Sequence, residues 1–450
     1  MERSIGAWHG GLLVLVVGLL SACAPPFVEQ PVVPEGTVSP GSQLIGCDQA
    51  DQRVVVTSDV HLDPACVYRA GFDITASDVE LDCRGARVED TDGTLRIGIL
   101  VTAPTDVPLG HIRVRNCLVK GFLNNIRVTR EGFKQLARGA EYENGFRDIV
   151  LEHNHLYSSR GSGIFVDGYV TGVTMRDMDI AGSGGVGIYL EAGSKGSTVE
   201  GNHIHRNGFT GTGPEGTVFD LGGGTQIRYQ STGREGLAID GSSDNRVIGN
   251  RFEDNANGAI LVYKNCGEYV TLKPQSWWTR PYGADRNLIE GNVISREDQG
   301  VWIGSRMSEN QLVLGCSDPA YVDRPGMRVH EDQADGNTVR DNEFHGVRWG
   351  VRVEDDATSV VGNRFTAGDP AGASVLIGTE YRTTMLDRPV TGTRLIGNHT
   401  DPGGPLHPYV WVHGHVDTDV EDNSIDSATA TLDPGVQPPR SPFLMVVRFL

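Results

Sequence analysis

Basic residues are scarce in this chain of 450 residues. It has 39 Lys and Arg against 58 Asp and Glu, which gives a formal net charge of 39 − 58 = −19. A nucleic-acid-binding protein needs a basic face to meet the phosphates, so we exclude a nucleic-acid partner. Hydrophobic residues make up 38% of the chain, which is enough to bury a core and excludes general disorder.

The sequence also lacks a hydrophobic run long enough for a permanent membrane span. The apolar stretch 12–20 is too short to cross a bilayer. It follows Arg3 and ends in Leu20-Ser-Ala-Cys23. This order is typical of a bacterial lipoprotein signal peptide over residues 1–23, with Cys23 as the lipidated N-terminus, although an ordinary signal peptide with a chance cysteine is the alternative. We expect a Pro-rich linker at 24–45 and a lipid-anchored protein in the cell envelope.

No Cys-x-x-Cys pair is present, so nothing points to a thiolate metal site. Apart from Cys23 the chain has an even number of cysteines, and in an exported protein this is typical of disulfides. Several pairings are compatible with that count. Proximity in the sequence favours Cys47 with Cys66, Cys83 with Cys117, and Cys266 with Cys316.

One short phrase returns along the chain: an aliphatic residue, any residue, Gly or Asp, Asn, any residue, and an aliphatic or aromatic residue. Asn154 to Asn202 is 48 residues and Asn202 to Asn250 is 48, so each interval fits two coils of about 24 residues. Asn tolerates the left-handed conformation of a tight turn, and its amide can bond to the Asn of the next coil. The later repeats are centred on Asn292, Asn342, Asn363, Asn398 and Asn423.

Short alternating strands follow many of these phrases, and each is opened by a glycine. The openers are Gly163, Gly187, Gly236, Gly258, Gly300 and Gly350. Period-two strands separated by turns at a fixed spacing indicate a stacked solenoid. The pattern resembles the right-handed parallel β-helix. We therefore expect an all-β, monomeric chain with one such solenoid at 46–430 and a tail or cap at 431–450.

Two basic residues fall at the same count from these glycines. The sixth position is Lys264 after Gly258 and Arg306 after Gly300. This places a Lys and an Arg on adjacent coils, about 4.8 Å apart in the stacking direction. Like charges do not stack without compensation, so the pair suggests a site for an anion; two solvated strand ends are the alternative.

The stretch between these two residues differs from the rest of the chain. Residues 264–306 contain six basic and five acidic residues, 6 − 5 = +1, in a chain of −19. They also contain Trp277, Trp278 and Tyr282, whose flat rings suit the faces of sugars, unless the loop packs its own aromatic residues. We predict that an acidic polysaccharide binds here, through Trp277, Trp278, Arg280, Tyr282, Arg286, Gln299, Trp302 and His330.

The segments Leu261-Val-Tyr-Lys264-Asn265 and Ile303-Gly-Ser-Arg306 resemble the catalytic strands of the chondroitinase B/alginate lyase group of β-helical polysaccharide lyases. The resemblance implies β-elimination on a uronic acid, with Lys264 removing the C5 proton and Arg306 assisting departure of the 4-O leaving group. The family commonly holds Ca²⁺ through carboxylates on the strand that bears the lysine. Here residues 257–259 are Asn-Gly-Ala, so we identify no metal ligands. Arg280, Arg286 or Gln299 would then neutralise the substrate carboxylate.

Other patterns leave alternatives open. Asp167, Glu191, Asp240 and Glu354 recur at one strand position, which suggests a hydrolase with paired carboxylates. We interpret them as solvated acids at the ends of strands, because the clustered Asp-Asp and Gly-His-Gly strands of β-helical pectin hydrolases are missing. A C5-epimerase and a non-catalytic carbohydrate-binding lipoprotein are the remaining alternatives to the lyase.

Two His-x-His pairs are also present, at residues 153–155 and 203–205. Both follow the repeated Asn positions or flank them, and we interpret them as stacked turn residues, with a metal-binding or proton-transfer role as the alternative.

The lyase interpretation makes a direct prediction. Lys264→Ala should abolish the ultraviolet absorbance of unsaturated uronate ends while leaving the fold intact, because the base that removes the C5 proton is gone. Unchanged activity in that variant would exclude Lys264 as the base.

Overall fold

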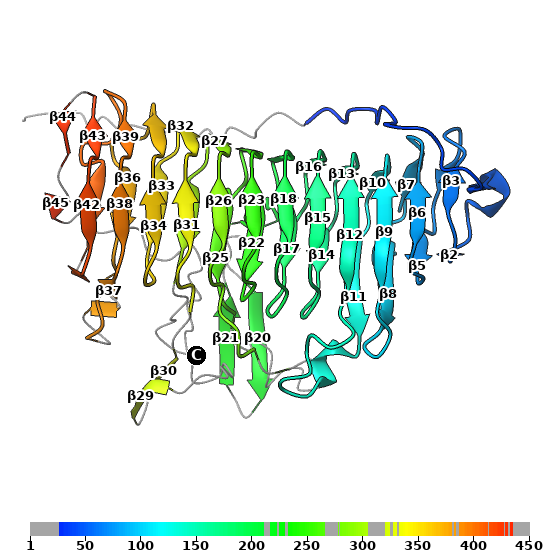
Figure 1. The fold of residues 1–450 in the computed structure, drawn as a ribbon, viewed down its shortest axis with the longest axis horizontal. Helices are drawn as coiled ribbons and strands as arrows, with labels where there is room; N and C mark the ends of the chain where they lie inside the picture. Colours follow the sequence, from blue (N-terminus) through cyan, green and yellow to red (C-terminus); the bar gives the residue numbers. More distant parts are fainter. Residues whose placement is uncertain are drawn as a thin grey trace, which may run out of the picture.

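The computed structural model describes residues 27–210, 217–222, 225–229, 233–265, 278, 280–304, 320–324, 327–330, 333–379, 382–383, 387–412, 414–426, 428–430 and 433–434. Its strands stack into three long sheets that run the length of an elongated solenoid (Figure 1). Each sheet has thirteen strands, and from β3 onward the chain visits the three sheets in turn on each coil. The parallel β-helix expected from the sequence is confirmed.

Sheets A and C contribute two walls of the solenoid. Sheet A contains β1 (Gln43–Ile45), β3 (Val60–Leu62), β6 (Val79–Asp82), β9 (Gly110–Arg115), β12 (Arg147–Glu152), β15 (Val173–Arg176), β18 (Thr198–Glu200), β23 (Arg246–Ile248), β26 (Leu288–Glu290), β31 (Thr338–Arg340), β34 (Ser359–Val361), β38 (Arg394–Ile396) and β42 (Asp419–Glu421). Sheet C contains β4 (Val67–Tyr68), β7 (Arg87–Glu89), β10 (Leu118–Lys120), β13 (His155–Tyr157), β16 (Asp179–Ala181), β19 (His203–His205), β24 (Arg251–Glu253), β27 (Val293–Ser295), β32 (Glu343–His345), β35 (Arg364–Thr366), β39 (His399–Thr400), β43 (Ser424–Ile425) and β44 (Ala428–Thr429).

Sheet B is the third wall. It contains β2 (Val54–Val56), β5 (Phe72–Ile74), β8 (Ile97–Pro104), β11 (Asn124–Glu131), β14 (Ser162–Val166), β17 (Ile188–Leu190), β22 (Leu237–Asp240), β25 (Ile260–Tyr263), β28 (Gln299–Ile303), β33 (Trp349–Val353), β36 (Ala373–Ile377), β40 (Tyr409–Trp411) and β45 (Asp433–Pro434). The remaining elements are the strand pairs β20–β21 (Thr217–Gly222, Thr225–Tyr229), β29–β30 (Ala320–Arg324, Met327–His330) and β37–β41 (Val390–Thr391, His415–Val416), and the short 3-10 helices η1 (Cys47–Gln49) and η2 (Phe133–Gln135). No helix in the described part of the chain is long and apolar enough to cross a membrane.

The interior is filled by the inward residues of the alternating strands. In sheet B, Ile164, Ile188, Leu237 and Ile260 align on successive coils and are all fully buried. This stack of β-branched and leucine side chains belongs to a single continuous core. Burial of each such side chain contributes about 1.5–3 kcal/mol, so the core is the main source of stability.

A ladder of asparagines closes the corner between sheets A and C. The Asn250 amide donates to Asn292 Oδ1 at 3.0 Å, and the Asn292 amide donates to Asn342 Oδ1 at 2.9 Å. The same contact continues through Asn363, Asn398 and Asn423. The stacking of Asn side chains predicted from the repeat is therefore confirmed.

The backbone of this turn differs from the expectation in one respect. In the main repeats the left-handed residue is the one before the Asn, such as Gly249 at φ 61° and Asp341 at φ 55°. Gly and Asp precede the Asn because Gly has no Cβ penalty there and Asp tolerates the conformation. The Asn is thus free to serve the ladder.

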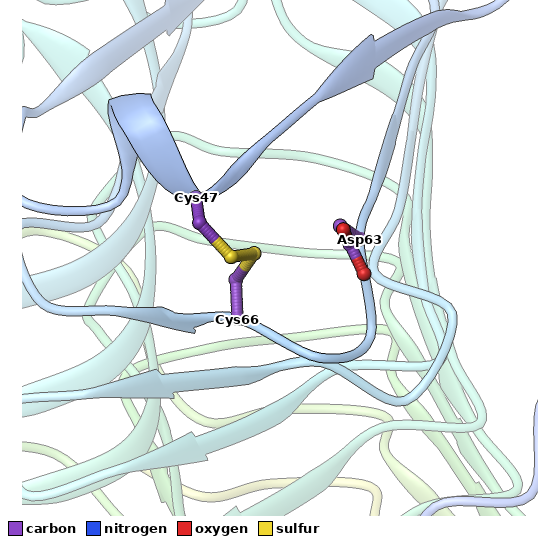
Figure 2. Close-up of side chains that lie close together, drawn as sticks. All are labelled: Cys47, Asp63 and Cys66. Carbon is purple, nitrogen blue, oxygen red and sulfur yellow. A yellow bond between two sulfur atoms is a disulfide. The ribbon is translucent and has the colours of Figure 1, made fainter.

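Two of the three predicted disulfides are present. Cys47–Cys66 and Cys83–Cys117 are bonded near the N-terminal end of the solenoid. Figure 2 shows the first bond with Asp63 beside it. Its sulfurs are joined to each other, so this group of side chains is no thiolate metal site. Cys266 and Cys316 lie outside the described residues, as does Cys23.

The described part of the predicted linker lies against the solenoid and does not stand free of it. The dark blue segment in Figure 1 runs along the coils toward the end of the solenoid where β3 lies. The Gln30 amide donates to the Tyr157 hydroxyl at 3.1 Å, the Glu35 amide donates to Asn116 Oδ1 at 2.9 Å, and Ser39 donates to Glu80 at 2.8 Å. Residues 27–42 are therefore part of the folded unit.

The ladder predicts the effect of one substitution. Asn292→Ala removes the acceptor for both Asn250 donors and leaves the Val247 carbonyl without its amide partner. Each buried group left unsatisfied costs about 1–3 kcal/mol, so the free energy of unfolding should fall by several such increments. Urea denaturation measures this loss. Arg246→Ala, at an exposed position of the neighbouring coil, should stay within about 0.5 kcal/mol of the wild type; equal effects in the two variants would contradict a stabilising ladder.

Candidate functional site

The outward face of sheet B carries an aligned row of side chains over β11, β14, β17 and β22. Arg127, Phe165, Tyr189 and Ala238 face one another in register on successive strands. The Phe165 and Tyr189 rings are stacked, with centroids 4.9 Å apart and an angle of 12° between their planes. Each ring covers one face of the other, and the Arg127 guanidinium lies over the Phe165 ring, 5.3 Å from its centroid.

A row of acids begins two residues further along the same strands. Asp167 follows β14, Glu191 follows β17, and Asp240 ends β22, so the three carboxyls lie on consecutive coils. They are not the solvated strand ends expected from the sequence. Asp167 and Asp240 are 2% and 0% exposed, and Glu354 at the same position further on is 4% exposed.

Specific partners hold two of these acids. Arg127 binds Asp167 through two contacts of 2.7 and 2.9 Å. Asp240 accepts from the Tyr189 hydroxyl and from both the backbone and the side-chain amide of Asn265, at 2.5 and 2.6 Å for the latter two. These contacts hold the Asp167 and Asp240 carboxylates in place, and the two carboxylates in turn position the side chains that they bind.

Glu191 differs from both. Its side chain is 12% exposed and lies 3.4 Å from Arg280, which also approaches the Asn265 carbonyl. Burial raises the pKa of Glu191 to about 7; Arg280 opposes that rise, and the charge of Asp240 adds to it. At neutral pH this carboxyl exists in both protonation states, which suits a group that gives and takes protons.

These residues line a cavity of about 320 Å³ on the outward face of sheet B. Its wall contains one carboxyl, Glu191, and two guanidinium groups, Arg234 and Arg280. The remaining lining residues are Gly161, Ser162, Phe165, Gly185, Val186, Tyr189 and Asn265.

A residue beside the cavity holds the guanidinium group of Arg234 in place. Arg234 contacts Glu235 through two bonds of 3.1 Å, and Glu235 accepts from the Tyr263 hydroxyl at 2.8 Å. Burial, Asp240 and Glu191 raise the pKa of Tyr189 well above its ordinary value, so its hydroxyl keeps its proton. The cavity thus combines an aromatic face, hydrogen-bond donors and one proton-transfer group.

The alignment of Gly258 with Gly300, from which the positions of Lys264 and Arg306 were counted, was wrong by one residue. The strand pairing matches Gly236 with Ala259 and Ala259 with Gly300, because Ile260 pairs with Leu237 and with Val301. Gly258 belongs to the turn before β25. Between the paired positions Glu253–Ser295 and Ile260–Val301, this coil has six residues and the next coil has five. Asn265 therefore occupies the sixth position, and Lys264 lies one place earlier.

Lys264 is fully buried and is not among the cavity-lining residues. Burial raises the pKa of Asp285, and Lys264 is among the positive charges that oppose the rise, so Lys264 acts on that carboxyl. Arg306 and Trp277 lie outside the described residues, and of His330 only the backbone, in β30, is described.

The other predicted substrate-binding residues separate into three groups. Arg280 lines the cavity. Trp278 is 5% exposed and packs with Tyr282 of its own loop and with Phe133 and Tyr169 of other segments, so it is a packing residue. Trp302 and Gln299 are buried in sheet B, and Arg286 is exposed and pairs with Asp244 at 2.8 Å.

Sequence reasoning did not select Phe165, Tyr189, Glu191, Arg234 and Asn265 as a binding site. Glu191 and Tyr189 were visible as members of the strand pattern. Arg234 and Asn265 carry no motif, because they reach the cavity from the ends of different coils. Correct register was the missing information.

Comparisons with known proteins agree on the architecture. Residues 110–273 match the family model described as "Right handed beta helix region". No curated protein matches the chain.

Solved structures with a similar fold include the A-module of mannuronan C-5 epimerase AlgE4 from Azotobacter vinelandii, at 12% identity over 87% of this chain and 94% of that one, with a TM-score of 0.41. They also include an alginate lyase from Paenibacillus sp. str. FPU-7, at 10% identity over 83% and 99% of the two chains, with a TM-score of 0.35. A third is the catalytic domain of a GH87 alpha-1,3-glucanase in complex with nigerose, at 10% identity over 90% of this chain and 70% of that one, with a TM-score of 0.44. These likenesses carry no functional assignment. The parallel strand pairing and the family model identify the chain as a right-handed parallel β-helix.

The raised pKa of Glu191 predicts a pH dependence of stability. Between its ordinary pKa and about 7 the folded state keeps a proton that the unfolded chain has lost, so the contribution of Glu191 to stability falls as pH rises. Glu191→Gln removes that fall. The free energy of unfolding of the variant, relative to the wild type, should therefore increase between pH about 5 and about 8 in chemical denaturation. Glu200→Gln, at an exposed position, should show no such trend. A constant difference for Glu191→Gln would refute the pKa assignment.

Proposed function

We propose that this chain is a polysaccharide-processing enzyme that takes an acidic sugar into the Glu191 cavity and cleaves the polymer by β-elimination. The observation that carries the proposal is the Glu191 carboxyl, whose pKa is raised to about 7 and which lies 3.4 Å from Arg280 in a cavity that Arg234 also lines. The proposal keeps the lyase class expected from the sequence and moves its centre from Lys264 to Glu191.

The composition of the cavity favours an acidic sugar. Of its charged lining residues, Arg234 and Arg280 are positive and only Glu191 is negative. A guanidinium group has five N–H donors, so Arg280 can contact a substrate carboxylate as well as Glu191. Phe165 and Tyr189 give the cavity an apolar wall for a sugar ring, and Ser162 and Asn265 offer polar groups for its hydroxyls.

The chemistry follows from these roles. A proton next to a carboxylate becomes acidic when that carboxylate is neutralised, which Arg280 does. Ionised Glu191 takes the C5 proton, the electron pair forms the C4–C5 double bond, and the bond from C4 to the linking oxygen breaks. Protonated Glu191 then returns the proton to that oxygen. One group with a pKa near the working pH performs both transfers.

The described residues give less support to hydrolysis. Two-carboxylate hydrolysis needs an acid and a second free carboxylate across the scissile bond. Among the described residues Glu191 is the only carboxyl that lines the cavity, because Asp167 and Asp240 are buried beneath their partners. A C5-epimerase differs from the lyase only in the fate of the proton, and product analysis separates the two.

The activity test compares matched variants on alginate, pectate, hyaluronan and chondroitin sulfate. Glu191→Gln should lose at least about 100-fold in the rate at which unsaturated uronate ends form, because the proton-transfer group is gone. Glu200→Gln is the control and should retain full activity. Arg280→Ala should lower kcat and raise KM, since Arg280 both binds the substrate carboxylate and neutralises it in the elimination step.

Two outcomes would overturn the assignment. Glu191→Gln with wild-type activity would exclude this cavity as the catalytic centre. Activity lost in a folded Lys264→Ala but kept in Glu191→Gln would return the centre to the lysine. Changed sugars without chain cleavage, seen by NMR of the product, would identify an epimerase, and binding without any product would identify a carbohydrate-binding protein.

The lipid anchor at Cys23 and a place in the bacterial cell envelope belong to the same proposal, since an enzyme for polymers acts where polymers are. Residues 1–26 lie outside the described part of the chain. The sequence Leu20-Ser-Ala-Cys23 supports both the lipid anchor and the location in the cell envelope.

A further inference from the structure

A second group of functional side chains lies on a different wall of the solenoid, on the outward face of sheet C. Asp179 on β16 pairs in register with His203 on β19, and His205 projects from the same face two residues further on. The two imidazole rings are stacked, with centroids 4.0 Å apart and 12° between their planes. Both rings therefore extend side by side toward the neighbouring strand.

The ligand atoms of these three residues converge. His205 Nε2 lies 2.9 Å and His203 Nδ1 lies 3.7 Å from the same carboxylate oxygen, Asp179 Oδ1. One ligand atom from each residue falls within 4.8 Å of the others. In a tetrahedral zinc site with bonds near 2 Å, neighbouring ligand atoms are about 3.3 Å apart. The two ring planes are nearly parallel, so one imidazole has to rotate before both nitrogens can point at one ion.

The other atoms of these side chains have partners of the kind that metal ligands use. His203 Nε2, on the far side of the ring from Asp179, is 3.3 Å from Glu253 Oε2 on β24. The Tyr157 hydroxyl donates to Asp179 Oδ2 at 2.5 Å, which leaves Oδ1 for the histidines. Metal-bound histidines commonly donate their second N–H to a carboxylate, and bound carboxylates are themselves hydrogen-bonded.

The surroundings shield part of the site. Side-chain exposure is 17% for Asp179, 14% for His205 and 37% for His203. The Phe27 ring of the N-terminal segment lies edge-on to His205, with centroids 6.2 Å apart. Arg251 and Arg296 contact Glu253, so their charges are directed at that carboxylate and not at Asp179.

We propose that Asp179 Oδ1, His203 Nδ1 and His205 Nε2 bind one divalent transition-metal ion of the zinc class, with Glu253 orienting His203. Three protein ligands of the N and O type leave a fourth position for water or an exogenous ligand. The site lies on sheet C and the Glu191 cavity on sheet B, so the two are separate.

The N-terminal segment is coupled to this site. Phe27 contacts the His205 ring, and Gln30 bonds to Tyr157 and His155 on the neighbouring strand of the same wall. Because the metal binds only the folded arrangement, its binding also stabilises this segment against the solenoid.

The test is a metal titration of the full chain purified without a polyhistidine tag. Zn²⁺ in isothermal calorimetry should bind with one equivalent, and Co²⁺ should give the visible absorption of a low-symmetry, four-coordinate ion. His205→Ala should abolish both signals. Glu253→Gln, which leaves the ligands in place, should weaken binding about 10–100-fold.

His399→Ala is the matched control. His399 also meets a carboxylate, Asp401 at 2.9 Å, on an outward position of sheet C, but no second histidine stands beside it in β39. This variant should bind Zn²⁺ as the wild type does. No binding by the wild type, or binding that persists unchanged in a folded His205→Ala, would overturn the proposal.

Discussion

The register between successive coils is the constraint on which the rest of this structure depends. Each corner of the middle coils is held by a ladder in which one side chain serves both its own turn and the next. The ladder of Asn250, Asn292 and Asn342 closes one corner, and the pairs Asn245–Asn287 and Asn255–Glu297 close the others. Because these amides are buried, a slip of one coil past another leaves several donors and acceptors without partners. The stack therefore has a single alignment, and every outward row inherits it.

That alignment turns short strands into functional surfaces. Short strands and the segments that flank them bring four cavity residues together: Phe165, Tyr189, Glu191 and Arg234. No two neighbouring coils carry a sequence motif that predicts this site. The same geometry places Asp179 beside His203 and His205 on another wall. In a solenoid the inward residues are alike on all coils because they share one core, and the outward residues are free to differ. Functional sites therefore form where the outward rows combine acidic, basic and aromatic side chains.

The sequence was sufficient for the architecture and insufficient for the site. The repeated Gly-Asn phrase predicted the coils because each of its residues has a fixed physical role. The left-handed residue turns the chain, and the Asn side chain bonds to the Asn of the next coil. The site depended on exact register between coils. One additional residue in the turn before β25 moved Gly258 out of line, and a one-residue error places a side chain on the opposite face of a strand. The burial of Trp278 was also beyond reach, because it depends on Phe133 and Tyr169, which are distant in sequence.

The central claim is that Glu191 shares its cavity with an acidic sugar and changes protonation near neutral pH. The most direct measurement is an NMR titration of its carboxyl carbon, assigned by comparison with Glu191→Gln, with and without a uronate oligosaccharide. The account predicts a midpoint near 7 for the free protein and a higher midpoint when a second carboxylate occupies the cavity beside Arg280. A midpoint at the ordinary value of a glutamate, or one that the oligosaccharide leaves unchanged, would contradict it.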